Sequence, residues 1–135
     1  MSNMVDTSET GRPSVLVVDD EDNISFLVSS ALRLAEIDVV TASNGRDAVT
    51  LAASARPDAV VLDLHLREGN GIDVMRALRQ VGTLPTFIVL TNHSGLPYRK
   101  AALEAGADHF LDKSTEIPLV LSLIRTLQRG ARTTK

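Results

Sequence analysis

The chain has 135 residues, no cysteine, and 14 Lys and Arg against 17 Asp and Glu, which gives a formal net charge of −3. The lack of cysteine excludes disulfide bonds, thiolate metal sites and cysteine catalysis. The balanced charge, with 3 Phe, 1 Tyr and no Trp, argues against direct nucleic-acid binding, which needs clustered basic residues and aromatic platforms.

Residues 1–13 lack the basic start and apolar run of a signal peptide. No apolar stretch approaches the ~20 residues that cross a bilayer, so we expect no membrane contact and a cytoplasmic protein. The pattern predicts a flexible N-terminal segment (1–13), one domain (14–130) and a frayed C-terminal tail (131–135).

Short apolar runs alternate with longer segments of helical periodicity along the chain. The predicted strands are residues 14–18, 38–42, 59–63, 86–91 and 109–112, and the predicted helices are 24–35, 45–54, 72–81, 97–105 and 117–127. This βα alternation predicts an α/β fold with a doubly wound, five-stranded parallel sheet, (βα)5 and flavodoxin-like, in strand order 2-1-3-4-5.

Local signals within these elements give further expectations. Asp22 or Asn23 is predicted to cap the first helix. Gly71 is predicted to serve a turn that needs positive φ. The first helix carries an apolar series at helical spacing that is predicted to face the core: Ile24, Leu27, Val28, Ala31 and Leu34.

Polar residues stand at the ends of four predicted strands. Asp19 and Asp20 follow the first strand, Asp63 ends the third, Thr91 ends the fourth, and Lys113 follows the fifth. Ligands of doubly wound sheets bind outside the carboxyl ends of the strands, between strands 1 and 3. We therefore expect these five side chains to converge on one crevice.

The chemistry of this set favours a hard divalent cation. The loop "DDEDN" after the first strand carries four carboxylates, which would repel a phosphate held by backbone alone. Magnesium takes carboxylates and waters and shares its shell with phosphoryl groups. With Mg²⁺ on Asp19 and Asp20, Asp63 is the candidate nucleophile for an aspartyl-phosphate, with Lys113 and Thr91 bonding the phosphoryl oxygens.

Four stretches, "VLVVDDEDN", "VVLDLHLREGNGID", "VLTN" and "AGADHFLDKS", closely resemble the receiver domain of response regulators in two-component signalling. The resemblance covers about residues 15–129. It implies a signalling module, not an enzyme, in which Asp63 accepts a phosphoryl group from a sensor histidine kinase or histidine phosphotransfer protein. It also implies a Mg²⁺ shell of Asp19, Asp20, Asp63 and the backbone carbonyl of His65.

The same resemblance implies a switch. Thr91 matches the family's switch hydroxyl, and Phe110 matches its switch aromatic, which would swing from solvent to core. The alternative is that Phe110 is an ordinary core residue in the resting state. This would reshape the face made by helix 97–105, strand 109–112 and helix 117–127. Leu119 and Leu123 fall outside the core stripe of the last helix and are expected to face solvent there, as contacts for an output protein or a second copy.

Three positions depart from the family pattern. Arg67 and Ser114 stand where proline is common, and Asn92 stands where a small residue is usual. None removes a catalytic group, but they leave open a receiver that only docks partners. The chain stops soon after the last helix, which suggests a stand-alone regulator, although a piece of a longer regulator would read the same.

A small Mg²⁺-dependent phosphohydrolase is the alternative enzyme class. Such enzymes also form an aspartyl-phosphate, but they usually carry the nucleophile on the first strand, with a second Asp two residues on and a cap domain. Here Asp19 and Asp20 are adjacent and no segment is long enough for a cap.

Overall fold

The computed structural model describes residues 12–133 and has a five-stranded parallel sheet in the order β2-β1-β3-β4-β5. The strands are β1 (Ser14–Val18), β2 (Asp38–Ala42), β3 (Ala59–Leu62), β4 (Thr86–Thr91) and β5 (His109–Asp112). The predicted fold class and strand order are therefore confirmed. Most of the predicted N-terminal segment and the last two residues of the predicted tail lie outside the described residues.

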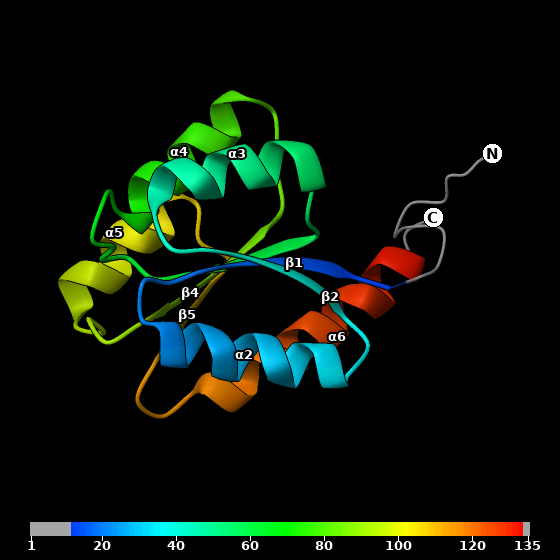
Figure 1. The fold of residues 1–135 in the computed structure, drawn as a ribbon. Helices are drawn as coiled ribbons and strands as arrows, with labels where there is room; N and C mark the ends of the chain where they lie inside the picture. Colours follow the sequence, from blue (N-terminus) through cyan, green and yellow to red (C-terminus); the bar gives the residue numbers. More distant parts are fainter. Residues whose placement is uncertain (1–11, 134–135) are drawn as a thin grey trace.

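Five helices cover the sheet: α2 (Asp22–Leu34), α3 (Gly45–Ala55), α4 (Gly71–Gln80), α5 (Leu96–Ala105) and α6 (Ile117–Thr133). Figure 1 shows α2 and α6 on one face and α3, α4 and α5 on the other. The bounds of α2 to α5 differ by one or two residues from those predicted, whereas α6 continues well beyond residue 127. No helix among the described residues is long and apolar enough to cross a membrane.

The strands read as continuous apolar runs because helices cover both faces of the sheet. In β1, Val15 and Val17 belong to the core cluster under α2 and α6. Leu16 and Val18 alternate with them and belong to the cluster under α3, α4 and α5. Two hydrophobic layers thus fix the register of the sheet, and with it the positions of the strand ends.

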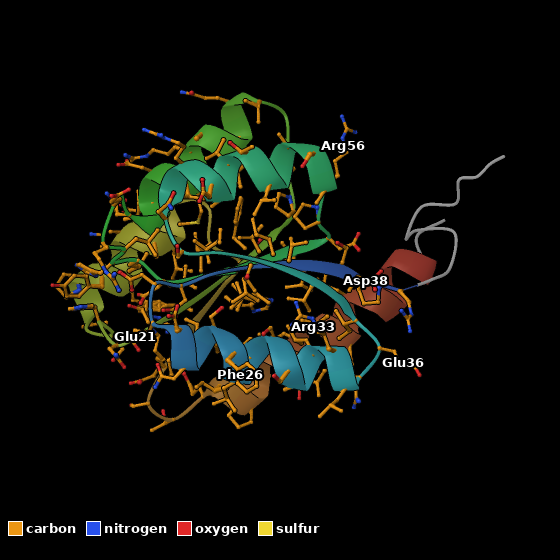
Figure 2. The ribbon with its side chains drawn as sticks, viewed as in Figure 1. Glu21, Phe26, Arg33, Glu36, Asp38 and Arg56 are labelled. Atoms are coloured by element: carbon orange, nitrogen blue, oxygen red, sulfur yellow. The ribbon has the colours of Figure 1, made fainter. Side chains whose placement is uncertain are left out.

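The predicted core stripe of α2 is partly wrong. Val28 and Leu32 are buried, whereas Leu27 is 51% and Leu34 88% exposed, and Ala31 is also exposed. The buried row runs at i, i+4, so Leu27, Ala31 and Leu34 fall on its flank. Phe26 lies on the outer face of the same helix (Figure 2) and is also exposed.

The predicted cap of α2 is also wrong, since the N-cap is Glu21 and neither Asp22 nor Asn23. Glu21 has extended backbone and makes no side-chain cap hydrogen bond. Its carbonyl accepts the N–H groups of Ile24 and Ser25. Asp22 instead lies in the first turn, where its negative charge interacts favourably with the positive end of the helix dipole.

The helices α3 and α4 begin with the same short motif, Asn-Gly-x-Asp, at residues 44–47 and 70–73. In each, the Asn side chain accepts the N–H of the Asp at 2.9 Å. The Asn amide then donates back to the Asp carboxylate, at 3.1 Å in α3 and 3.0 Å in α4. In each helix this cap satisfies one free backbone N–H group of the first turn, that of the Asp, and favours the helix starting at this point.

Candidate functional site

The hydrogen-bond ladder of the sheet places the candidate site residues. The N–H of Asp63 donates to the carbonyl of Val18 at 3.0 Å, and the N–H of Lys113 donates to the carbonyl of Thr91 at 2.9 Å. Both bonds continue strand pairing just past the strand ends. Asp63 therefore lies beside the end of β1, next to Asp19, and Lys113 lies beside the end of β4.

Lys113 joins two of the predicted aspartates. Its Nζ lies 2.7 Å from Oδ2 of Asp63 and 2.9 Å from Oδ2 of Asp19, with Oε1 of Glu21 at 3.7 Å. Lys113, Asp63 and Asp19 are all buried. A buried ammonium is stable only when it is paired and hydrogen-bonded, and here two carboxylates supply those partners.

The charges of this cluster shift the pKa values of two of its members. Burial alone would lower the pKa of Lys113, but its hydrogen bonds to Asp19 and Asp63 raise it above the ordinary value. Burial raises the pKa of Asp19 above its ordinary value, against the opposing hydrogen bond from Lys113. Lys113 is therefore an ammonium at neutral pH, and burial makes ionised Asp19 costly.

Asp20 is the most accessible of the predicted metal carboxylates, and Arg67 contacts it. Nε of Arg67 lies 3.8 Å from Oδ2 of Asp20, and the guanidinium donates to the backbone carbonyl of Asp20 at 3.1 Å. The side chain of Arg67 is 81% exposed, so this pair is screened by solvent and weak. The departure from proline at position 67 thus brings a second cation to the acidic cluster.

The donor set fits magnesium by its chemistry. Within residues 12–133, no three histidine or carboxylate side chains form a ready-made metal cage. Magnesium keeps several waters and needs only one or two carboxylates with a phosphoryl group. Asp19, Asp20 and Asp63 supply carboxylate oxygens for such a site, and Asp20 is the most accessible of the three.

The predicted switch residues lie on the next strands. Thr91 is fully buried, and its Oγ1 accepts the N–H of His93 at 3.2 Å. Phe110 is already buried in the core cluster under α3, α4 and α5, and the guanidinium carbon of Arg99 lies 5.7 Å from its ring centroid. In this conformation Phe110 is therefore already a core residue, so the predicted swing from solvent to core cannot begin from it.

The turn after Lys113 is held by Asp112. Its Oδ1 accepts both the N–H of Ser114 at 2.8 Å and the hydroxyl of Ser114 at 2.6 Å. These bonds, with a further one from Ser94, lower the pKa of Asp112. Ser114, at the second position that departs from proline, thus anchors this turn by hydrogen bonds.

Gly71 has a different role from the one predicted. The positive-φ glycines of the described chain are Gly69, Gly82 and Gly106, whereas Gly71 is the first residue of α4. A Cβ at position 71 would lie 2.5 Å from the backbone carbonyl oxygen of Asp63. Gly71 is therefore required for close packing of α4 on the backbone of the candidate nucleophile.

A cluster of three rings lies beside the site. The ring centroids of His65 and His93 are 3.8 Å apart, and the ring of Tyr98 lies 5.5 Å from His65 and 5.2 Å from His93. The sequence pointed to His65 only for its backbone carbonyl and did not point to His93 or Tyr98. We refer to His65, His93 and Tyr98 as the ring cluster.

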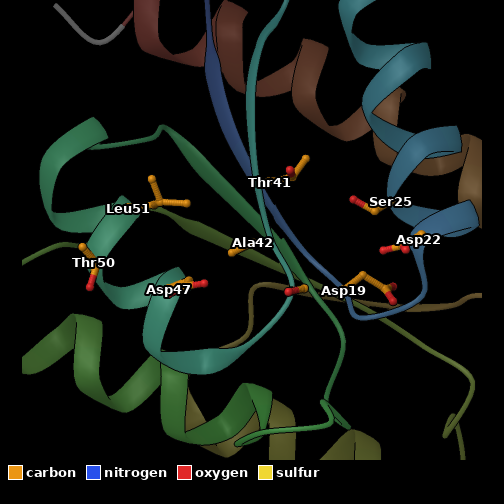
Figure 3. Close-up of a pocket in the computed structure, with 9 residues that line it drawn as sticks. Asp19, Asp22, Ser25, Thr41, Ala42, Asp47, Thr50 and Leu51 are labelled. Atoms are coloured by element: carbon orange, nitrogen blue, oxygen red, sulfur yellow. The ribbon is translucent and has the colours of Figure 1, made fainter.

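A polar hollow of about 410 Å³ lies next to the acidic cluster. Figure 3 shows Asp22 and Ser25 from α2 on one side of β2, and Asp47 and Thr50 from α3 on the other. Asp19 contributes to its lining, but the candidate nucleophile does not. The hollow thus adjoins the site and is separate from the reacting carboxylate.

The family of the chain follows from comparison with known proteins. The model of the response regulator receiver domain matches residues 15–125, which is most of the chain, so the chain belongs to this family. It is similar to the transcriptional regulatory protein PrrA of Mycobacterium tuberculosis, at 37% identity over 125 residues, covering 93% of this chain and 53% of the relative. It is also similar to the response regulator MprA of Mycolicibacterium vanbaalenii, at 39% over 115 residues, covering 85% and 50%.

The fold agrees with this assignment. The receiver domain of the Francisella response regulator 1452 superimposes with a TM-score of 0.82 at 24% identity, covering 89% of this chain and 99% of that one. The chain spans about half the length of the curated relatives described above. It therefore matches the receiver portion of these longer proteins.

Proposed function

We propose that Asp63 accepts a phosphoryl group from the phosphohistidine of a sensor histidine kinase or a histidine phosphotransfer protein. Receiver domains of two-component systems act as phosphoryl-accepting signalling modules. The observation that carries the assignment to Asp63 is the ammonium of Lys113, 2.7 Å from its carboxylate. A buried cation beside a buried carboxylate can stabilise the charge of an incoming phosphoryl group.

In the proposed step, a carboxylate oxygen of Asp63 attacks phosphorus, the P–N bond of the donor breaks, and its electron pair stays on the donor imidazole. Lys113 bonds a phosphoryl oxygen while it keeps its contact with Asp19. Asp19, Asp20, Asp63 and the carbonyl of His65 would hold Mg²⁺, which supplies positive charge against the carboxylates and the phosphoryl group. We propose that the phosphorylated chain acts in signalling and does not turn over a phosphate ester.

The proposed switch begins at Thr91. An aspartyl-phosphate adds negative charge and acceptor oxygens, toward which the hydroxyl of Thr91 can donate. Its present bond from the N–H of His93 would then change, and the loop between β4 and α5 would move. Because Phe110 is already in the core, we propose that its altered packing against Arg99 transmits this movement to α5.

The face that would respond is made by α5, β5 and α6, which we call the output face. A shallow cavity of about 270 Å³ lies on it, lined by Leu103, Leu119 and Leu123 together with Phe110 and Arg99. Leu103 and Leu119 are 43% and 44% exposed. Leu123 is only half-buried in this surface and also contacts the core under α2 and α6, so the prediction that it faces solvent is only partly right.

We propose that the output face binds an output protein or a second copy of the chain through Leu119. Substituting Leu119→Glu is expected to leave phosphorylation intact and to weaken self-association or partner binding, measured by sedimentation with and without acetyl phosphate. Leu34→Glu is the matched control, because Leu34 is a more exposed leucine on α2. If the wild type and both variants associate equally and bind the same partners, the proposal that the output face binds through Leu119 is contradicted.

The phosphoacceptor assignment is tested by intact-mass spectrometry after incubation with acetyl phosphate. We expect one phosphoryl adduct with Mg²⁺, none with EDTA, and none in Asp63→Asn. Release of phosphate from an ester over many turnovers would favour the phosphohydrolase alternative instead. An adduct that persists in Asp63→Asn would contradict the proposal.

A further inference from the structure

The ring cluster is exposed to solvent, although its three rings come from separate parts of the chain. His65 follows β3, His93 follows β4, and Tyr98 lies in the first turns of α5. His65 and His93 are exposed, and Tyr98 is 41% exposed. Because none of the three rings is buried in the core, their grouping adds little to hydrophobic packing and leaves ring surface available.

The backbone fixes this cluster to the reacting groups. The N–H of His65 donates to Oδ1 of Asp63 at 3.3 Å, and the N–H of His93 donates to Oγ1 of Thr91 at 3.2 Å. The two imidazoles are therefore carried by residues hydrogen-bonded to the candidate nucleophile and to the switch hydroxyl. Any molecule that approaches Asp63 from this side meets these rings.

The geometry of phosphoryl transfer determines which part of a phosphoryl donor lies next to the ring cluster. The attacking and leaving atoms stand roughly in line through phosphorus, and a productive complex holds the attacking oxygen about 3–3.5 Å from phosphorus. The buried ammonium of Lys113 lies 2.7 Å from Oδ2 of Asp63 and so occupies the inner side of that carboxylate. The leaving group must therefore lie on the outer side, toward solvent.

We propose that the ring cluster binds the leaving imidazole of the phosphohistidine donor by ring stacking, and so selects phosphoramidate donors over acyl phosphates. This inference rests on the proposed phosphoacceptor function of Asp63. The three rings lie at centroid separations of 3.8 to 5.5 Å, with two tilted pairs and one edge-to-face pair. A further aromatic ring can pack against them in the same offset or edge-to-face geometries. Acetyl phosphate leaves acetate, which has no ring.

The reaction balances without a further reagent. Asp63 forms the new P–O bond, and the P–N bond of the donor breaks with its electron pair on nitrogen. A donor ring that is protonated at its other nitrogen leaves as neutral imidazole. The ring cluster takes no proton in this step and contacts only the leaving ring.

The test compares two small donors, monophosphoimidazole and acetyl phosphate, at saturating Mg²⁺. The phosphorylation rate constant is measured by intact mass for the wild type, His93→Ala, Tyr98→Ala and His93→Phe. We expect each alanine variant to lower the ratio of the monophosphoimidazole rate to the acetyl phosphate rate by about two- to tenfold, which is the range of one aromatic pair. His93→Phe keeps a ring and is expected to restore the ratio.

The remaining histidine of the chain, His109, supplies the matched control. It begins β5, and its strand partner is Ile88, so His109→Ala is expected to leave the ratio unchanged. Equal slowing with both donors, or no change in the ratio while acetyl phosphate still modifies Asp63, would overturn the ring-cluster proposal alone. No adduct on Asp63 from either donor would overturn the proposed function as well.

Discussion

Replacing Gly71 by alanine tests how closely α4 is fitted to the phosphoacceptor strand. The added Cβ would lie 2.5 Å from the carbonyl oxygen of Asp63 and 3.2 Å from Cα of Leu64. An ordinary contact begins near 3.4 Å, so the backbone must give by about 0.9 Å. Both contacting groups are backbone, which cannot turn aside as a flexible side chain can.

We expect Gly71→Ala to lower the free energy of unfolding by about 1–3 kcal/mol, the cost of overpacking a tightly packed site. Gly45→Ala is the control, because Gly45 begins α3 in the same Asn-Gly-x-Asp motif. A Cβ at Gly45 would meet Val74 at 3.4 Å, an ordinary contact, so this variant should be neutral or gain up to about 1 kcal/mol from helix propensity.

Urea unfolding measures both variants. With a slope of about 2 kcal/mol per molar, a loss of 2 kcal/mol lowers the midpoint by about 1 M. The acetyl phosphate rate of Gly71→Ala should also fall, up to about 100-fold, because a shift of about 1 Å misplaces the nucleophile. Equal midpoints for the two variants would show that the contact with Asp63 does not require a glycine at position 71.

Two further predictions concern the acidic cluster, the first without magnesium and the second with it. Because burial raises the pKa of Asp19, its protonated form stabilises the fold, so Asp19→Asn should be more stable than the wild type at pH 7. The free energy of unfolding of the wild type rises as the pH falls from the raised pKa of Asp19 toward the ordinary value of 3.8. Chemical denaturation at several pH values should therefore show that the difference in stability between Asp19→Asn and the wild type becomes smaller in acid. A difference that grows in acid would contradict this prediction. Arg67 competes with Mg²⁺ for Asp20, so calorimetric titration of Arg67→Gln should give a two- to fivefold higher Mg²⁺ affinity, about 1 kcal/mol or less. Arg76→Gln removes another largely exposed arginine, on α4, and should leave the affinity unchanged. An equal gain in both variants would indicate only a general charge effect.

The sheet and most of the site could be predicted from the sequence because both depend on strand ends. Parallel strands bring their carboxyl ends to one edge, so residues that follow the apolar runs must gather there. The contacts of Lys113 with Asp19 and Asp63 agree with this expectation. The alternation of apolar runs and helical segments was enough for this prediction, because each βα unit shows the pattern locally and repeats it.

Contacts between distant segments could not be predicted in this way. The approach of α4 to the backbone of Asp63 depends on how a helix seats on the sheet, and Gly71 alone reads as an ordinary turn residue. The ring cluster joins residues from two loops and one helix, and the spacing of these residues in the sequence follows no period. The apolar residues of α2 exceed its buried face, so Leu27 and Leu34 fitted the helical spacing without facing the core.

Locating the phosphoryl group on the chain directly tests the proposed role of Asp63 as phosphoacceptor. The protein is incubated with acetyl phosphate and Mg²⁺ and then reduced with borohydride, which converts an aspartyl-phosphate to homoserine, and its peptides are sequenced by mass spectrometry. We expect homoserine at Asp63 and no other modified aspartate. Homoserine at Asp19 or Asp20 with Asp63 unchanged would contradict it.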